Sequence, residues 1–180
     1  LEQINNAWHT KMQETEDFFN NVPNKQKIFN YTLNDVKRKQ AGELIKMLNI
    51  GRGGKRPATA KLDDMKQVFE ENPNVFCFRT QEESSEEIRQ MNPKDIRRMN
   101  PKEILATNIN LGGVDTDIII NTNPFFAEHV LFVPERLKKN HPQVFIKEAA
   151  RVALATLRDI NRPSYKIAFN SWLAWGSINH

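Results

Sequence analysis

The stretch Asp117-Ile-Ile-Ile-Asn-Thr-Asn-Pro-Phe-Phe-Ala-Glu-His-Val-Leu-Phe-Val-Pro134 decides the fold class of this chain. Its two apolar runs, Ile118–Ile120 and Val130–Val133, are short and are bounded by a polar turn that contains Asn123-Pro124. Continuous apolar runs of this length predict strands that are buried on both faces, and Asn-Pro is typical of a turn. The stretch therefore predicts a central strand and its hairpin neighbour.

The segment that follows predicts a helix over residues 142–160, because apolar residues recur there at intervals of three and four. Pro142 suits the first turn of this helix, and Pro163 lies just beyond its end. Residues Lys166–Phe169 are apolar enough to return as a strand. Strand, hairpin, helix and strand together predict an α+β fold, in which a long helix packs on an antiparallel sheet.

The first half of the chain gives weaker signals. Residues 1–20 predict a helix, since apolar side chains recur at about helical spacing, and Pro23 ends it. Residues 24–40 are expected to be a polar connection with an apolar patch at Ile28-Phe29 and Tyr31. A short amphipathic piece, an irregular loop and a strand are expected to follow, in that order (Gly42–Leu48, Gly51–Pro57 and Val75–Phe78).

Residues 80–104 are highly charged and contain a tandem repeat. Met91-Asn-Pro-Lys-Asp-Ile96 recurs as Met99-Asn-Pro-Lys-Glu-Ile104, with a period of eight residues. Each Asn-Pro-Lys unit can start a helical turn, with Asn as the cap and Pro in the first position. Eight residues are too few for a solenoid unit. We expect a charged insertion that packs loosely on a single domain of residues 1–180 and could bind a protein partner.

The composition bounds the class of protein. The chain has 180 residues, enough for one domain with a core, and carries a net charge of +4. No apolar run approaches about 20 residues, so no membrane span is expected. Cys77 is the only cysteine, which excludes an internal disulfide and suits a reducing, cytoplasmic location. The amino terminus has no signal-peptide pattern and no Met, which suggests an excised piece of a longer protein.

Basic residues occur in short clusters such as Lys37-Arg38-Lys39 and Arg97-Arg98. These clusters fit a solvated surface or phosphate binding. Nucleic-acid binding is disfavoured, because no helix-turn-helix, zinc-finger or RNA-recognition pattern accompanies the charge. No His/Cys cluster has the spacing of zinc ligands, so no zinc site is expected. The acidic pairs, which include Glu82-Glu83, lie in charged surface runs and are assigned no catalytic role.

The last residues of the chain carry the strongest chemical signal. Asn170-Ser171, a loop with two tryptophans, and then Ser177, Asn179 and His180 follow the predicted strand. Small hydroxyl and amide groups before a His can hold a phosphate, and the His can act on it near neutral pH. The alternative is ordinary loop capping, since Asn and Ser favour turns. Trp172 and Trp175 are either core residues or a surface that stacks on a purine.

Three blocks in this order resemble the GDP-hexose phosphorylases, namely GDP-D-glucose phosphorylase of animals and GDP-L-galactose phosphorylase of plants. The first block is Leu48-Asn-Ile-Gly-Arg-Gly-Gly-Lys-Arg-Pro57, the second is the Asp117–Pro134 stretch, and the third is Asn170–His180. This branch belongs to the histidine-triad and galactose-1-phosphate uridylyltransferase-like superfamily. The resemblance therefore implies a histidine-triad-like antiparallel sheet.

The resemblance also implies an activity. A nucleophilic His would attack the α-phosphorus of a GDP-hexose, and hexose 1-phosphate would leave. Inorganic phosphate would then take the guanylyl group from that His to give GDP, without a cofactor. The partners implied are GDP-hexose and inorganic phosphate. By match to the motifs, His180 is a supporting catalytic residue, and the nucleotide-binding residues are Asn170, Ser171, Ser177, Asn179, Asn121, Asn123, His129, Arg52, Lys55 and Arg56.

The chain also departs from the family pattern. Glu128 stands where the family usually has Gly, and Trp172 and Trp175 replace smaller residues. The second His of the His-x-His-x-Gln motif, which takes the nucleotidyl group in the family, would follow His180. We therefore expect a domain truncated at its C-terminal end that is inactive as given. The alternatives are a catalytically inactive histidine-triad-like module that binds nucleotides or proteins, and an RNA-binding module supported by charge alone.

Overall fold

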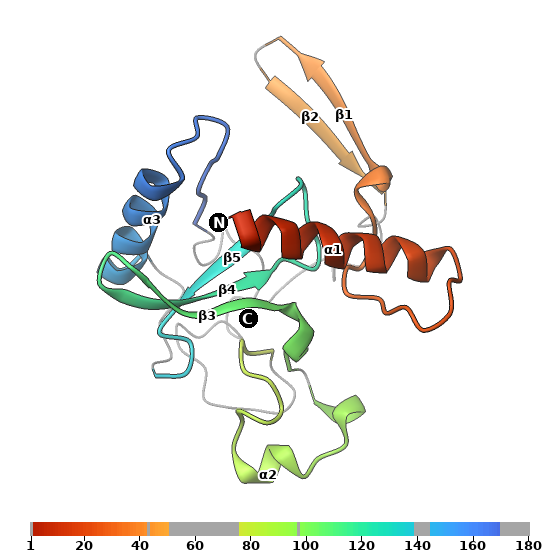
Figure 1. The fold of residues 1–180 in the computed structure, drawn as a ribbon, viewed down its shortest axis with the longest axis vertical. Coiled ribbons are helices and arrows are strands. Elements are labelled where there is room, and N and C mark those ends of the chain that lie inside the picture. Colours follow the sequence, from red (N-terminus) through yellow and green to blue (C-terminus); the bar gives the residue numbers. More distant parts are fainter. Residues whose placement is uncertain (1, 43, 51–75, 97, 139–144, 170–180) are drawn as a thin grey trace, which may run out of the picture. The chain divides into compact units, whose positions relative to one another are not determined.

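A computed structural model describes residues 2–42, 44–50, 76–96, 98–138 and 145–169, and Figure 1 shows their helices and strands. The chain forms two compact units. Unit 1 consists of residues 1–58 and 119–131, and unit 2 of residues 59–118 and 132–180. Each unit is described by itself below. The expectation of a single domain stays a prediction.

Unit 1 begins with the helix α1 (Glu2–Phe19), which confirms the predicted amino-terminal helix. Its buried face carries Trp8, Met12 and Thr15. The Thr15 hydroxyl accepts hydrogen bonds from the backbone N–H groups of Ile28 and Phe29, at 3.1 and 3.2 Å. The segment after α1 therefore turns back along the helix, as Figure 1 shows. The apolar patch of this predicted polar connection is buried, since Ile28, Phe29 and Tyr31 all belong to the core.

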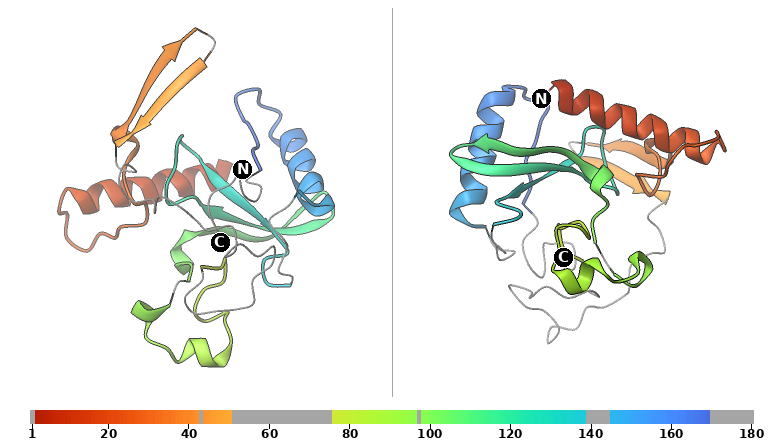
Figure 2. Two further views of the ribbon diagram at one scale, coloured as in Figure 1. Left: turned by 180° about the vertical axis from the view of Figure 1, so that it is seen from behind. Right: turned by 60° about the horizontal axis from the view of Figure 1, so that its bottom comes forward.

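A second feature of unit 1 is an antiparallel hairpin of β1 (Val36–Ala41) and β2 (Leu44–Asn49), preceded by the 3-10 turn η1 (Leu33–Asp35). The hairpin forms a two-stranded sheet of its own, which the left view of Figure 2 shows clearly. The sequence did not predict it, because β1 is almost entirely basic and polar and lacks the alternation of a half-buried strand.

The three-stranded sheet has the strand order β3-β4-β5, with the bounds Ile104–Leu111, Val114–Ile120 and Val130–Pro134. The predicted central strand and its hairpin neighbour are confirmed as β4 and β5. Ile118, Ile119 and Ile120 are all buried, as a continuous apolar run predicts. The strand β3 was not predicted, since exposed asparagines interrupt its apolar residues.

In unit 2, the helix α3 (Lys147–Ile160) lies against the turn between β3 and β4. Gly112 in that turn has φ +61°, and a Cβ there would lie 2.8 Å from the Arg151 carbonyl oxygen, so only glycine fits. The helix ends at Ile160, and Asn161 caps it in a left-handed conformation. Pro163 follows just beyond this end, as predicted. Residues 142–144 of the predicted helix lie outside the described residues.

The predicted strand at Lys166–Phe169 is wrong, since these residues form no strand. They are exposed, and the Phe169 ring packs edge-on against Phe145 at 5.3 Å rather than within a sheet. The mixture of helices and antiparallel sheets nevertheless confirms the α+β class.

The charged segment 80–104 contains α2 (Glu86–Arg89) and two 3-10 turns, η4 (Pro93–Asp95) and η5 (Pro101–Glu103). Each Asn-Pro-Lys unit forms a turn as predicted, because the side chains of Asn92 and Asn100 accept from the backbone N–H groups two residues later, both at 3.0 Å. Whether this segment is an insertion stays a prediction.

Loose packing of this segment was the wrong expectation. Ile88 is 4% exposed and Met99 is 2% exposed, so both contribute to the core. The Met99 N–H also donates to the Arg79 carbonyl at 3.2 Å. The strand predicted at Val75–Phe78 is reduced, among its described residues, to an isolated bridge between Cys77 and Arg98.

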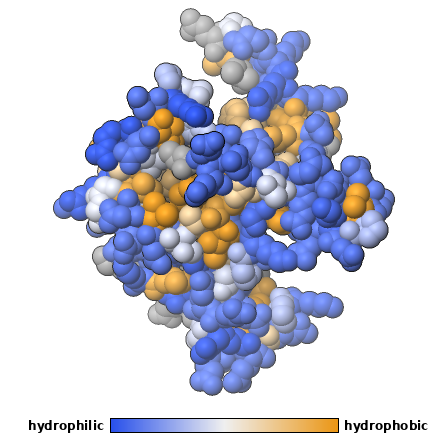
Figure 3. Space-filling model, in the orientation of Figure 1, coloured by the Kyte–Doolittle hydropathy of each residue, from blue (hydrophilic) through white to orange (hydrophobic). Residues whose placement is uncertain are grey.

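Hydrophilic residues cover most of the face shown in Figure 3, in keeping with the mean hydropathy of −0.63. Among the described residues, no helix has both the length and the apolar character needed to cross a membrane.

Candidate functional site

The connection between β4 and β5, Asn121–His129, is called the polar turn below; it belongs to unit 1. The Asn121 N–H donates to the His129 carbonyl at 3.3 Å, and the Asn121 side-chain oxygen accepts from the Asn123 N–H at 3.0 Å. The polar turn thus brings together three residues that the sequence predicted as nucleotide-binding, Asn121, Asn123 and His129.

The His129 ring is held within the polar turn. Its Nδ1 atom lies 3.2 Å from the Phe125 backbone nitrogen, and its Nε2 atom lies 3.2 Å from the Asn121 side-chain nitrogen. The ring also stacks on Phe125. Both of these neighbouring groups are hydrogen-bond donors. A neutral imidazole accepts a hydrogen bond at only one of its nitrogens, and a doubly protonated imidazole accepts at neither. These contacts give His129 a structural role in shaping the turn.

Glu128 has a left-handed backbone conformation, with φ +61°. An L-residue pays roughly 1–2 kcal/mol for this conformation, whereas glycine adopts it freely. The family that the sequence resembles usually has Gly at this position. The Glu128 carboxylate lies 3.1 Å from the His9 Nε2 atom of α1, a contact that glycine would not make.

We expect Glu128→Gly to be more stable than Glu128→Ala by about 1 kcal/mol, the reverse of the usual order of the two residues. Both variants lose the His9 contact, so the comparison isolates the backbone conformation. Urea denaturation of the two variants measures the difference. An alanine variant as stable as the glycine variant would contradict the left-handed conformation.

Asn30 and Tyr31, in the segment that follows α1, fix the polar turn to the rest of unit 1. The Asn30 N–H donates to the Thr122 carbonyl at 2.9 Å, and the Asn30 amide donates to the Asn123 side-chain oxygen at 3.1 Å. The buried Tyr31 hydroxyl donates to the Pro124 carbonyl at 2.9 Å. Because the hydrogen bonds from Asn30 and Tyr31 fix the backbone of the polar turn, its side-chain amides are preorganised in the absence of a ligand.

A cation also lies at the polar turn. The Arg38 guanidinium of β1 lies 5.2 Å from the centre of the Phe126 ring, within the range of a cation–π interaction. The basic cluster that contains Arg38 was predicted only as a surface or a phosphate-binding group. The amide groups of the polar turn and a guanidinium beside it can together bind an anionic ligand with polar substituents.

The other predicted site residues lie outside the described part of the chain. They are the phosphate-binding candidates of the glycine loop and the C-terminal block (Arg52, Lys55, Arg56, Asn170, Ser171, Ser177, Asn179 and His180). Trp172 and Trp175 lie there as well. Their roles stay predictions from the motifs.

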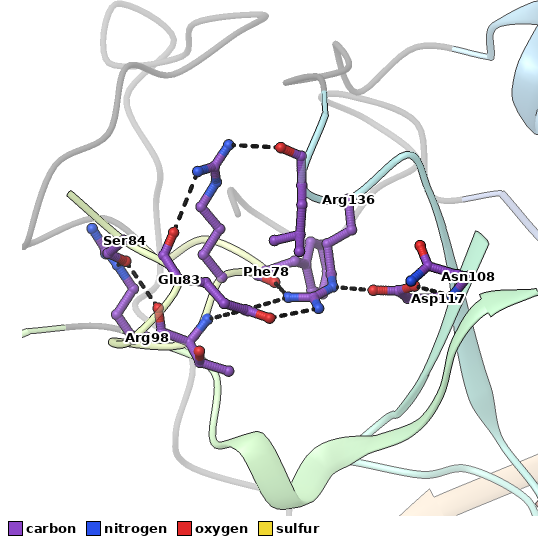
Figure 4. Close-up of polar contacts among 10 residues, drawn as sticks. Phe78, Glu83, Ser84, Arg98, Asn108, Asp117 and Arg136 are labelled. Carbon is purple, nitrogen blue, oxygen red and sulfur yellow. Dashed lines mark hydrogen bonds and ion pairs between the residues drawn. The ribbon is translucent and has the colours of Figure 1, made fainter. Parts of the chain in front are cut away.

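Sequence reasoning missed a buried ion-pair network in unit 2, drawn in Figure 4. The Arg136 side chain is 2% exposed and makes two bonds to Glu83, at 2.6 and 2.9 Å. Its Nε atom donates to Asp117 at 2.5 Å, and it also donates to the Phe78 carbonyl at 2.8 Å. Asp117 further accepts from the Asn108 N–H at 2.8 Å. Every charge in this network is paired, which favours a structural role.

The network changes the ionisation of its members. The hydrogen bonds from Arg136 lower the pKa of Glu83 from 4.5 to about 2, against the effect of burial. Elsewhere in unit 2, burial raises the pKa of Glu103 to about 7, although the Asn100 N–H favours its charged form. A signal for the network existed in the sequence: Asp117 directly precedes the apolar run Ile118–Ile120 of β4, and a charge beside such a buried run requires a partner.

Among the described residues, no group of three or more His, Cys, Asp or Glu side chains could hold a metal ion. The expected absence of a cofactor stays a prediction, because the C-terminal block is not among these residues.

The chain matches the family described as "GDPGP1-like, N-terminal domain" over residues 21–180. The chain therefore belongs to this family. The match confirms the resemblance to the GDP-hexose phosphorylases that the three motif blocks indicated. Neither the curated proteins nor the solved structures gave a significant match.

Proposed function

We propose that this chain is the N-terminal part of a nucleotidyltransferase that phosphorolyses a GDP-hexose to GDP and hexose 1-phosphate. The observation that carries the proposal is the family match over residues 21–180. The α+β fold with a buried central strand is compatible with a histidine-triad-like architecture, which forms part of the proposal.

The proposed reaction has two displacements at one phosphorus atom. A His side chain forms a bond to the α-phosphorus of the GDP-hexose, and the bond from that phosphorus to the bridging oxygen breaks, which releases hexose 1-phosphate. An oxygen of inorganic phosphate then forms a bond to the same phosphorus, and the bond from that phosphorus to the His nitrogen breaks. The imidazole leaves in the protonation state in which it first attacked. The product GDP thus contains the phosphate that was added.

The residue roles follow from chemistry and from motif position. The amides of Asn121 and Asn123 in the polar turn would contact the ribose or the base. Arg52, Lys55 and Arg56 would bind the phosphate oxygens through charge-assisted hydrogen bonds. Asn170, Ser171, Ser177 and Asn179 would support the α-phosphate, with His180 beside the nucleophile. His129 would act through the shape of the turn.

The competing proposal is a catalytically inactive module that binds nucleotides or proteins. Departures from the family pattern at Glu128, Trp172 and Trp175 favour it. A protein partner that binds through residues 80–104 remains a proposal, although the burial of Ile88 and Met99 leaves less of this segment available. A cytoplasmic location is likewise proposed from the single cysteine.

Turnover by the intact protein that contains this chain separates the two proposals. With GDP-glucose and inorganic phosphate, we expect GDP and glucose 1-phosphate in equal amounts. A His180→Ala variant of the intact protein should lose most of this turnover while it still binds GDP. Binding of GDP by the unmodified protein without turnover would instead support the inactive module.

A further inference from the structure

Unit 1 contains a hollow of about 400 Å³ between the end of α1 and the segment that turns back along it. This volume lies within the range of small-molecule sites in proteins. The hollow is lined by one carboxylate, three side-chain amides, a hydroxyl and two aromatic rings (Glu16, Asn20, Asn30, Asn34, Thr32, Phe19 and Tyr31).

The hollow adjoins the polar turn, because two of the residues that line it donate hydrogen bonds to the turn. Asn30 lines the hollow and donates to the Asn123 side chain, and Tyr31 lines it and donates to the Pro124 carbonyl. All of these residues belong to unit 1. A nucleotide whose ribose lies at Asn121 and Asn123 could therefore extend its base toward the hollow.

The polar groups of the hollow match the edge of guanine. Guanine presents two adjacent donors, N1–H and the N2 amino group, which a carboxylate accepts together. Its O6 and N7 atoms are acceptors, which suit amide donors such as Asn20 and Asn34. Within the described part of the chain, the Glu16 carboxylate makes no hydrogen bond or ion pair, so its oxygens are available.

We propose that this hollow binds the guanine base and that Glu16 distinguishes guanine from adenine. The inference rests on the proposed function, since it assumes a guanine nucleotide. Adenine would present the lone pair of N1 to the Glu16 carboxylate, and this repulsion disfavours it. The rings of Phe19 and Tyr31 supply the apolar contact that either purine requires.

The test is calorimetric titration of GDP and of ADP into the intact protein and into its Glu16→Gln variant. Glutamine keeps the size of the side chain, but its amide NH2 group would face one of the guanine N–H donors, so one of the two hydrogen bonds could not form. We expect roughly a tenfold or larger loss of GDP affinity and no loss for ADP. Glu14→Gln, on the same helix but outside the hollow, is the matched control and should leave both affinities unchanged.

Turnover of GDP-glucose with phosphate separates failure of this inference from failure of the proposed function. Unchanged GDP affinity in Glu16→Gln, in a protein that still turns over GDP-glucose, would overturn the hollow as the base site and leave the proposed function standing. Absence of both GDP binding and turnover in the unmodified protein would overturn both. An equal loss of affinity in Glu14→Gln would also overturn the specific role of Glu16.

Discussion

Replacement of Arg136 with alanine is expected to lower the free energy of unfolding by about 3–5 kcal/mol, because the change leaves buried carboxylates without their cation. Arg136 is the shared partner of Glu83 and Asp117 and also donates to the Phe78 carbonyl. Denaturation by urea, followed by circular dichroism, measures the loss. Arg158→Ala is the matched control, since Arg158 pairs with Asp159 at the surface and should contribute at most about 1 kcal/mol.

The same network predicts the pH dependence of stability. The pKa of Glu83 is lower in the folded chain, at about 2, than its ordinary value of 4.5. Its stabilising contribution is therefore present above pH 4.5 and is lost as the pH falls toward 2. Glu103 acts in the opposite sense, because its pKa is raised from 4.5 to about 7 in the folded chain. Its contribution to the stability of the fold is therefore fully present below pH 4.5 and is lost as the pH rises through 7.

In Arg136→Ala, the loss of stability between pH 4.5 and 2 should be smaller than in the unmodified protein, because Glu83 no longer has a charged partner. An unchanged acid profile, or a destabilisation no larger than that of Arg158→Ala, would contradict the buried network.

Deletion of Ser84–Asn100, with the ends joined, is expected to abolish the cooperative unfolding of unit 2. The deletion removes the buried side chains of Ile88 and Met99, and truncation of a single buried Ile or Met to Ala already costs about 2–5 kcal/mol. Two such losses approach the whole stability of a typical domain, which is about 5–15 kcal/mol. Thermal unfolding monitored by calorimetry should show no sharp transition for unit 2.

Point variants test the same packing without a change of backbone. Met99→Ala should lose about 2–5 kcal/mol, whereas Met91→Ala, at the matching position of the repeat but only half-buried, should lose clearly less. A deletion variant that retains its transition would show that the segment is a loosely attached insertion after all.

Local signals in the sequence predicted local structure well. The Asn-Pro-Lys units formed capped turns, and the run Ile118–Ile120 formed the buried central strand, since both outcomes depend on neighbouring residues. The strands β1 and β3 could not be predicted in this way. Their residues are largely exposed and polar, and pairing with the next strand, rather than burial of an apolar face, determines their conformation.

The candidate site was predicted in part. Asn121, Asn123 and His129 lie in one turn because the strands on both sides of it have strong apolar patterns. The positions of Glu16, Asn30 and Arg38 near that turn, or near the hollow beside it, depend on how α1 and the β1–β2 hairpin fold back. Such contacts join residues far apart in the sequence, and no local pattern reveals them.

The most direct test of the proposed function is to follow labelled inorganic phosphate during the reaction of the intact protein with GDP-glucose. Because phosphate attacks the α-phosphorus of the guanylyl-His, the label should appear in the β-phosphate of GDP, and the glucose 1-phosphate should be unlabelled. Label in glucose 1-phosphate would show attack at the sugar carbon instead. That result, or the absence of any phosphate-dependent turnover, would contradict a GDP-hexose phosphorylase that acts through a nucleotidyl-enzyme.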